Sequence, residues 1–501
     1  MLVFVRCVAT VLVAGLVLGS GALPSTTAAS GATAVDSTYF DAMLRKAQTT
    51  FRIPALSVAV VEGDDTTYAQ GFGQSDESGG AVRPDTPFVI GSVSKTLTAL
   101  GVAKLVEQGA IDLEASVRTY LPWFRLKDEA VAARITVRDL LHHTSGIPES
   151  AGLDLLDGTG TIREYVERLA GVDPQGEVGR TYAYSSANYN TLGAVIEAVT
   201  GDSYGHYMER EVFAPLAMRN SYTSLAAADR AGLVRGHTSV FGFPRPYDED
   251  IEPGGVPAGY LVSTSADLAH LAQAMLNDGR YDGVQVFSPA AIQLMREDVV
   301  PAGSDGASYG LGLFVGVLEG VAVEWHFGGS AGYSATLVML PEHDKGFVML
   351  ANLNGSHPVS VAAYQALRLN IIRTLIGEPT VPVDAARLVS WYVNASMVAA
   401  AVLVLAYLVT VPFWVRRLRR RARVSPWRHG WPRLVDVALP VAVLLVVPGL
   451  MGYSWTVLLT YAPDLAFTTL GIVGLWLVIG LAKSALVATR LVNRPNGRAG
   501  Q

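Results

Sequence analysis

The apolar stretch from Trp391 to Val415 constrains the fold of this chain more than any other feature of its sequence. It is nearly uncharged, and about 25 helical residues at about 1.5 Å each are enough to cross roughly 30 Å of hydrocarbon. Two further apolar stretches follow, Leu434–Thr460 and Leu465–Val487. A mean hydropathy of +0.31 with only 16% charged residues is also too apolar for a purely soluble protein of 501 residues. We therefore predict three transmembrane helices within residues 391–490.

The distribution of positive charge between these stretches predicts their orientation. The segment between the first and second stretches carries eight arginines, whereas the loop between the second and third has no lysine or arginine. The arginines are Arg416, Arg417, Arg419, Arg420, Arg421, Arg423, Arg428 and Arg433. Because positively charged loops stay on the cytoplasmic side, we predict that this loop and the tail, residues 491–501, are cytoplasmic. The chain is then a multi-pass protein of the cell membrane whose preceding domain is extracellular.

The N-terminal segment and the cysteine content indicate export. Val8–Gly19 is apolar, is preceded by Arg6 and is followed by the small-residue sequence Ala32-Thr33-Ala34. This pattern predicts a secretory signal peptide over residues 1–34, with an uncleaved N-terminal anchor as the alternative. Cys7 is the only cysteine, so the chain alone forms no disulfide, no Cys-ligated zinc site and no cysteine nucleophile.

The overall charge argues against a nucleic-acid partner. The formal net charge is −6 and the sequence pI is near 5.9, whereas a surface that follows phosphates needs clustered cations on the folded domain. The basic loop between two membrane spans already has a topological explanation. The sequence does not determine the oligomeric state.

Residues 35–376 have the pattern of a globular domain with mixed α and β structure. Leu56–Glu62 and Thr66–Phe72 flank a turn and predict a β-hairpin, and Ser92–Glu107 has the apolar spacing of a helix. Strands are predicted near the end of the domain at Tyr309–Leu318, Val321–Phe327, Tyr333–Leu340 and Phe347–Ala351, followed by a helix at Val359–Ile376 and a linker over residues 377–390. Strands at both ends of a mostly helical middle favour an α+β fold.

Ser92 is the candidate nucleophile. It opens Ser92-Val93-Ser94-Lys95, the only place where a serine stands three residues before a lysine. On a helix these two positions share a face, so the Lys95 amine can reach the Ser92 hydroxyl. A partly desolvated amine can accept the serine proton and activate the nucleophile. Such a spacing also arises by chance, and serine is an ordinary residue at a helix N-terminus, so the assignment needs further motifs.

Two further motifs follow along the chain, Tyr184-Ser185-Ser186 and His326-Phe327-Gly328, the latter continued by Gly329. Flanking segments of the same character are Phe88-Val89-Ile90-Gly91, Ile135-Thr136-Val137-Arg138-Asp139-Leu140-Leu141-His142-His143-Thr144-Ser145-Gly146-Ile147-Pro148 and Ala258-Gly259-Tyr260-Leu261-Val262-Ser263-Thr264. Together they resemble the serine β-lactamase and D,D-peptidase family, in its class C-related branch, over roughly residues 38–376. The resemblance implies a β-lactamase/transpeptidase-like fold: an antiparallel sheet flanked by helices, with a mostly helical subdomain.

The resemblance also implies catalytic roles. Ser92 would attack a carbonyl and form an acyl-enzyme, Lys95 would help to remove its proton, and Tyr184 would act as general base and acid. The backbone N–H groups of Ser92 and Gly329 would form an oxyanion hole, where a small residue lets the carbonyl approach the strand edge. Ser186, His326, Gly328 and Gly329 would contact the substrate. We predict no cofactor.

Two departures from the family pattern bear on the substrate. Ser186 stands where asparagine is usual, which replaces an amide by a shorter hydroxyl; Asn188 is nearby in sequence but need not compensate. His326 stands where true β-lactamases have lysine, so a permanent cation is replaced by a group with an unperturbed pKa near 6.5. Anchoring of a substrate carboxylate should therefore weaken, which favours esterase or D-peptidase activity over true β-lactamase activity.

Single motifs also have other interpretations. Tyr184 could be a core aromatic residue and His326 an ordinary histidine at a strand end. The pair His142-His143 has no further ligand at metal-site spacing, so we predict no metal site. Gly328-Gly329-Ser330-Ala331-Gly332 matches G-x-S-x-G, but a strand rather than a helix is expected after it, which argues against Ser330 as the nucleophile.

Three functional hypotheses follow. The first is an exported, membrane-tethered serine hydrolase that acts through acyl-Ser92 on an ester, an amide or a D-amino-acid peptide. Its partner is then a small-molecule or peptide substrate, and the cell wall is one source of such peptides. The second is a membrane sensor that binds penicillin or wall fragments and deacylates slowly, which the departure at Ser186 and the number of spans suggest. The third is a catalytically silent pseudoenzyme whose spans bind a membrane partner.

Overall fold

The computed structural model describes residues 37–75, 79–155, 160–249, 253–303, 306–354, 358–382, 385–420, 435–446 and 454–492. The predicted signal peptide, most of the Arg-rich loop and the predicted cytoplasmic tail beyond residue 492 lie outside these residues. The chain divides into two compact units, the first ending at Ala386 and the second beginning at Arg387.

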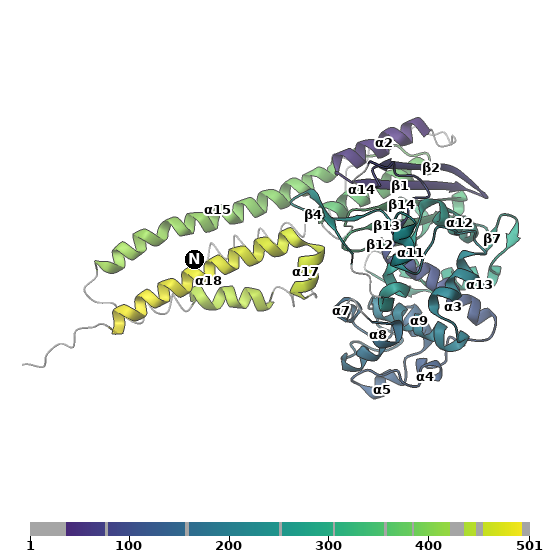
Figure 1. The fold of residues 1–501 in the computed structure, drawn as a ribbon, viewed down its shortest axis with the longest axis horizontal. Helices are drawn as coiled ribbons and strands as arrows, with labels where there is room; N and C mark the ends of the chain where they lie inside the picture. Colours follow the sequence, from purple (N-terminus) through teal and green to yellow (C-terminus); the bar gives the residue numbers. More distant parts are fainter. Residues whose placement is uncertain are drawn as a thin grey trace, which may run out of the picture. The chain divides into compact units, whose positions relative to one another are not determined.

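The first unit is built on an antiparallel sheet of eight strands (Figure 1). Their spatial order is β2-β1-β14-β13-β12-β11-β10-β9. The strands are β1 (Ala55–Glu62), β2 (Asp65–Gly73), β9 (Val300–Pro301), β10 (Ser308–Tyr309), β11 (Phe314–Leu318), β12 (Val321–Gly329), β13 (Ser334–Leu340) and β14 (Lys345–Ala351). The N-terminal hairpin thus pairs with the C-terminal meander through β1 and β14, from Leu56 opposite Ala351 to Glu62 opposite Lys345.

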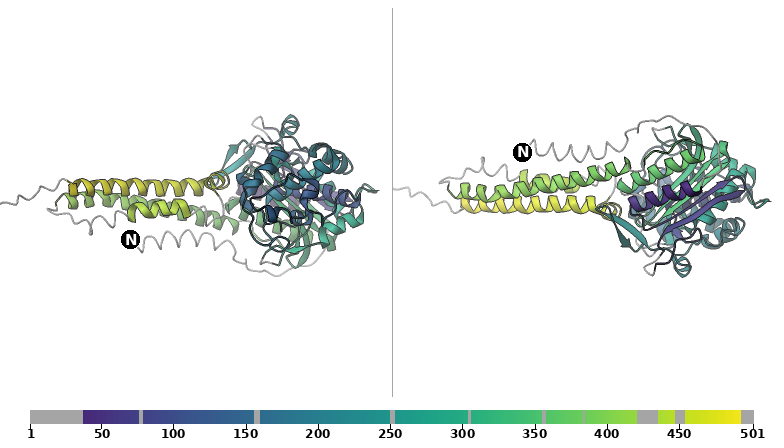
Figure 2. Two further views of the ribbon diagram at one scale, coloured as in Figure 1. Left: turned by 90° about the horizontal axis from the view of Figure 1, so that it is seen from below. Right: turned by 90° about the horizontal axis from the view of Figure 1, so that it is seen from above.

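Both faces of the central sheet are buried. Successive side chains of a strand point to opposite faces, and each face packs into its own apolar cluster. In β1, Leu56, Val58 and Val60 belong to one apolar cluster, whereas Ala59 and Val61 belong to the other. The first cluster is covered by the helices α2 (Ser37–Thr50) and α14 (Pro358–Leu375), which lie across the sheet in Figure 2. The second is covered by α3 (Ser94–Glu107), α9 (Ser186–Thr200) and α12 (Ser265–Leu276).

The middle of this unit's sequence forms a mostly helical subdomain, and most of its helices lie below the sheet in the view of Figure 1. Its shorter helices are α4 (Val117–Tyr120), α5 (Glu129–Ala132), α6 (Val137–Leu141), α7 (Glu149–Asp154), α8 (Ile162–Arg168), α10 (Tyr204–Met208), α11 (Leu225–Arg230) and α13 (Pro289–Glu297). Two-stranded sheets pair β3 (Phe88–Val89) with β6 (Val262–Ser263), β4 (Gly236–Val240) with β5 (Phe243–Tyr247), and β7 (Arg280–Tyr281) with β8 (Val284–Gln285). The predicted α+β class and antiparallel meander are confirmed.

One predicted strand is wrong. Tyr309–Leu318 is not continuous but is split into β10 and β11. Between them the chain passes over α3, where the Thr96 hydroxyl donates to the Gly312 carbonyl at 2.6 Å. Gly312 has φ +80°, and an added Cβ would lie 2.6 Å from that of Ala99, so this crossing requires glycine. Strand periodicity carries no information about such a contact with a distant helix.

The second unit is helical in its described part. It contains α15 (Ala385–Arg419), a shorter apolar helix over Val435–Val446, α17 (Trp455–Tyr461) and α18 (Pro463–Val492). Helix α15 begins at Ala385, so part of the predicted linker is helical. Among the described residues, one helix segment, Pro463–Thr489, is long and apolar enough to cross a membrane. Lys483 on it hydrogen-bonds the Tyr407 hydroxyl of α15 at 2.8 Å.

Candidate active site

Ser92 lies in a tight turn whose backbone contacts the end of β12. The turn is a single 3₁₀ segment, Gly91–Val93, that leads into α3. Gly91 has φ +53°, and an added Cβ would lie 2.5 Å from the Gly329 nitrogen. A Cβ on Gly328 would lie 2.0 Å from the Ile90 carbonyl oxygen and 3.1 Å from the Ser92 nitrogen. Only glycine permits this approach, which brings the backbones of Ser92 and of Gly328-Gly329 together, as an oxyanion hole requires.

Lys95 lies one turn after Ser92 and is fully buried. Its Nζ is 3.0 Å from Ser92 Oγ, 3.3 Å from Ser186 Oγ and 2.7 Å from the Ala258 carbonyl oxygen. Burial lowers the pKa of Lys95 to about 7, and the negative charge of Glu149 partly opposes this. A large fraction of Lys95 is therefore a neutral amine near neutral pH, with a lone pair that can accept the Ser92 proton.

The Ala258–Thr264 segment packs around the beginning of α3. The Ser94 hydroxyl accepts from the Leu261 N–H at 3.1 Å, and the Ile90 N–H donates to the Leu261 carbonyl at 3.0 Å. Ala258 belongs to a π-helical turn, Val256–Tyr260, which directs its carbonyl at Lys95. This segment therefore holds the lysine amine in place, a role that its sequence alone does not reveal.

Tyr184 lies beside both Ser92 and Lys95. Lys95 Nζ lies 4.9 Å from the centre of its ring, and the Ser92 side chain is close enough to influence the pKa of its hydroxyl. Burial raises the pKa of Tyr184 well above its usual value, although Ser92 acts in the opposite direction. The phenol is therefore protonated in the resting site and can donate a proton, whereas Lys95 is better suited to accept one.

Ser186 and Asn188 face different partners. Ser186 begins α9 and its hydroxyl reaches Lys95 despite being shorter than the asparagine side chain usual in the family. Asn188 does not replace that amide: it accepts from the Ser145 hydroxyl at 2.7 Å and contacts His143 Nδ1 at 3.1 Å. The second motif thus keeps a hydrogen bond to the lysine through a hydroxyl.

His326 lies on β12, is 1% exposed and is held on both sides. Its Nδ1 donates to the Phe327 carbonyl at 2.9 Å, so its Nε2 accepts from the Tyr309 hydroxyl at 3.2 Å. Burial, and secondarily the nearby Lys95, lowers the pKa of His326 to about 3. His326 is therefore neutral at physiological pH and supplies no cation for a substrate carboxylate.

Two aromatic residues of this site were not predicted. His143 is fully buried with its ring centre 4.4 Å from that of Tyr184, 5.2 Å from Tyr189 and 4.8 Å from Tyr309. Its Nδ1 accepts from the Ser185 N–H at 3.1 Å, so it supports the second motif directly. The neighbouring His142 instead contacts the Asp298 carbonyl at 3.0 Å. His143 lies in the Ile135–Pro148 segment, whose resemblance to the family could have indicated it. No local sequence pattern pointed to Tyr309.

Ser330 has a structural environment rather than that of a nucleophile. Its hydroxyl donates to Glu249 Oε2 at 2.8 Å, and the same carboxylate accepts from the Gly332 N–H at 2.9 Å. The predicted strand follows it as β13. We expect Ser330→Ala to keep covalent labelling, measured by intact mass, and to lower the free energy of unfolding by about 1–3 kcal/mol, because the partly buried Glu249 loses a donor. Loss of labelling in a variant that remains folded would contradict this.

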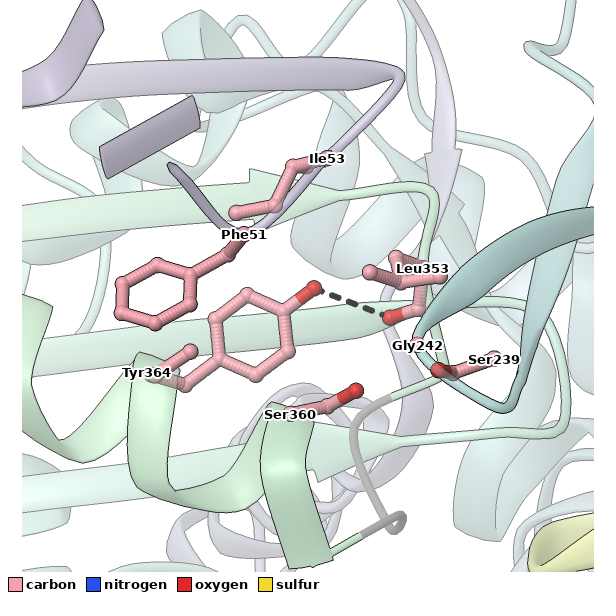
Figure 3. Close-up of a pocket in the computed structure, with 8 residues that line it drawn as sticks. Phe51, Ile53, Ser239, Gly242, Leu353, Ser360 and Tyr364 are labelled. Carbon is pink, nitrogen blue, oxygen red and sulfur yellow. Dashed lines mark hydrogen bonds between the residues drawn. The ribbon is translucent and has the colours of Figure 1, made fainter. Parts of the chain in front are cut away.

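A separate small pocket lies near the chain segments that precede β1 and follow β14 (Figure 3). Its lining residues are Phe51, Ile53, Ser239, Gly242, Leu353, Ser360, Ala363 and Tyr364. The Tyr364 hydroxyl is occupied by the Leu353 carbonyl at 3.0 Å, and the lining offers no base for either serine. This pocket therefore does not compete with the Ser92 site.

Comparison with known proteins gives a consistent result. The Beta-lactamase family model matches residues 40–370. The chain is 30% identical to penicillin-binding protein 4 of Amycolatopsis lactamdurans, over 68% of this chain and 88% of the relative. It is 28% identical to an unguisins hydrolase of Aspergillus campestris, over 62% of this chain and 60% of that relative's length. A D-stereospecific amidohydrolase from Streptomyces superposes with a TM-score of 0.52 at 25% identity, covering 62% and 93% of the two chains.

Proposed function

Because the chain belongs to the beta-lactamase family, whose fold is that of serine hydrolases, we propose that it is an exported, membrane-tethered hydrolase acting through acyl-Ser92. Its substrate is an ester, an amide or a D-amino-acid peptide. The observation that carries the proposal is the pairing of Ser92 with a buried lysine whose pKa is about 7. The unguisins hydrolase relative agrees with a hydrolase, and the D-stereospecific amidohydrolase agrees with an amide substrate.

The proposed reaction begins with attack by Ser92. As Ser92 Oγ bonds to the substrate carbonyl carbon, its proton passes to the neutral Lys95 amine, 3.0 Å away. The carbonyl oxygen becomes an oxyanion that accepts from the N–H groups of Ser92 and Gly329. When the bond to the leaving group breaks, that group takes a proton from Tyr184, which Lys95 then reprotonates. Water attacks the acyl-enzyme by the reverse proton path and releases the acid and free Ser92.

The membrane arrangement is part of the same proposal. We infer three spans within residues 391–490, with the hydrolase domain outside and the Arg-rich loop inside. The helix α15 supports the first span, and the apolar helix Pro463–Thr489 supports the third. The middle span, Leu434–Thr460, is supported by its sequence and by the apolar helix Val435–Val446. A substrate outside the cytoplasm is therefore expected.

A time course of intact mass on the full-length chain in detergent tests the proposed function. Wild type and Ser92→Ala are each mixed with benzylpenicillin, a D-Ala-D-Ala peptide and a short-chain 4-nitrophenyl ester. An adduct that needs Ser92 and disappears as product accumulates is expected. An adduct that persists far beyond seconds would instead support the slow sensor suggested by Ser186. Absence of both adduct and product with every substrate would contradict a hydrolase and support the pseudoenzyme.

A further inference from the structure

Glu249 is a partly buried carboxylate two residues after β5, and it accepts three hydrogen bonds from the turn between β12 and β13. Its Oε2 accepts from the Ser330 hydroxyl at 2.8 Å and from the Gly332 N–H at 2.9 Å. Its Oε1 accepts from the Ala331 N–H at 3.3 Å. Among the residues that the structure describes, no lysine or arginine pairs with this carboxylate. Hydrogen bonds from the turn therefore stabilise its charge.

The turn that Glu249 contacts begins directly after Gly329. Gly329 is the last residue of β12 and lies opposite Ser334 of β13, so residues 330–333 close this hairpin. Inside the turn, the Ser330 N–H donates to the Tyr333 carbonyl at 3.0 Å. The proposed reaction uses the N–H of Gly329 as one of two donors to the oxyanion. Because Ser330 is bonded directly to Gly329, a shift of the turn also moves this donor.

Side-chain packing does little to fix this turn, because three of the five residues from Gly328 to Gly332 are glycines. Glycine has no Cβ and a wide choice of backbone conformations, so hydrogen bonds must hold such a segment in place. Strand β4 supplies one of them, from the His237 N–H to the Gly332 carbonyl at 3.1 Å. An added Cβ on Gly332 would lie 3.0 Å from Gly236 Cα and 3.1 Å from Glu249 Oε2. The turn is thus held closely between β4 and the Glu249 carboxylate.

We propose that Glu249 is a positioning residue that fixes the N–H of Gly329 in the oxyanion hole. This inference rests on the proposed hydrolysis through acyl-Ser92. A donor stabilises an oxyanion when it lies about 2.7–3.1 Å from the oxygen, and a misplacement of about 1 Å costs about 10²-fold in rate. Loss of the Glu249 carboxylate therefore slows acyl transfer although Ser92 and Lys95 are unchanged.

An ester and its thionoester separate the position of the oxyanion donors from the other contributions to the rate. The pair is 4-nitrophenyl butanoate and the analogue whose carbonyl oxygen is replaced by sulfur, which is larger and accepts hydrogen bonds weakly. In the full-length protein, Glu249→Gln keeps the side-chain size but presents an NH₂ group to the donors of the turn. We expect kcat/KM to fall about 10- to 100-fold for the ester and by less than about threefold for the thionoester. Glu249→Asp, which keeps the charge but is shorter, should give an intermediate ratio of ester to thionoester hydrolysis.

The control variant is Asp248→Asn, which changes the neighbouring carboxylate. Asp248 is exposed and pairs with Arg235 at 2.8 Å, so its loss should leave the ratio at the wild-type value. Because both substrates are measured on one preparation, the ratio does not depend on the fraction of protein that is folded. An unchanged ratio in Glu249→Gln, whether both rates stay normal or both fall together, would overturn the positioning role. Absence of Ser92-dependent hydrolysis in wild type would overturn the proposed function, and this inference with it.

Discussion

Replacing Ser92 by alanine is expected to lower kcat/KM for a 4-nitrophenyl ester by at least about 10⁴-fold and to abolish the covalent adduct. The loss follows because Ser92 Oγ lies 3.0 Å from the Lys95 amine and beside the buried phenol of Tyr184. An alanine leaves the backbone N–H groups of the oxyanion hole in place but provides no atom to form the acyl bond. The measurement is ester hydrolysis together with intact mass on the full-length protein.

Ser330→Ala is the matched control for this experiment, since both variants remove one hydroxyl near β12. It should keep the adduct because Ser330 is bonded to Glu249 rather than to a base. Thermal unfolding of Ser92→Ala should stay close to that of wild type, which separates loss of chemistry from loss of the fold. Retained labelling in Ser92→Ala would identify a different nucleophile.

Replacing Lys95 by methionine is expected to lower kcat/KM by about 10²–10⁴-fold and to remove the acid limb of the pH profile. The pKa of Lys95 is about 7, so below this pH the amine is protonated and has no lone pair for the Ser92 proton. The wild-type rate should therefore rise with pH through about 7. His326, with a pKa of about 3, contributes no limb between pH 5 and 9. Stopped-flow or steady-state ester hydrolysis across this range measures the profile.

Lys104→Met is a suitable control because Lys104 lies on the same helix and pairs with Glu211 at 2.8 Å, away from Ser92. It should keep both the rate and the acid limb. The position of the limb also distinguishes the two candidate bases. A resting base at Tyr184 would require a limb far above neutral, because burial raises the pKa of that phenol well above its usual value. A limb near pH 7 that survives in Lys95→Met would contradict the assignment to the lysine.

The candidate catalytic residues could be located from the sequence where they are close together along the chain. Ser92 and Lys95 meet because a helical turn brings positions three apart to one face. Gly91, Gly328 and Gly329 mark backbone that approaches other backbone too closely for a side chain, and they stand at the predicted motifs. The hairpin, the C-terminal meander and the helix at α14 followed from period and turn residues, because strands and helices are specified by local patterns.

The remaining features depended on contacts across long stretches of chain. The sequence gives no sign that the Ala258 carbonyl, Ser186 and Lys95 converge, since they are separated along the chain and meet only when α9 and the Val256–Tyr260 turn pack on α3. The same holds for the interruption at Gly312, where a helix contact overrides strand periodicity.

By itself, then, the sequence determined the family, the fold class, the pairing of the candidate nucleophile Ser92 with Lys95, and the apolar stretches at the C-terminus. It did so because each of these depends on residue type at short spacing. Only the tertiary structure decided the ionisation of the site. Burial leaves a large fraction of Lys95 as a neutral amine near pH 7 and keeps His326 neutral. A pKa depends on the solvent and charges that surround a group in space, and these come from segments that are distant in the chain.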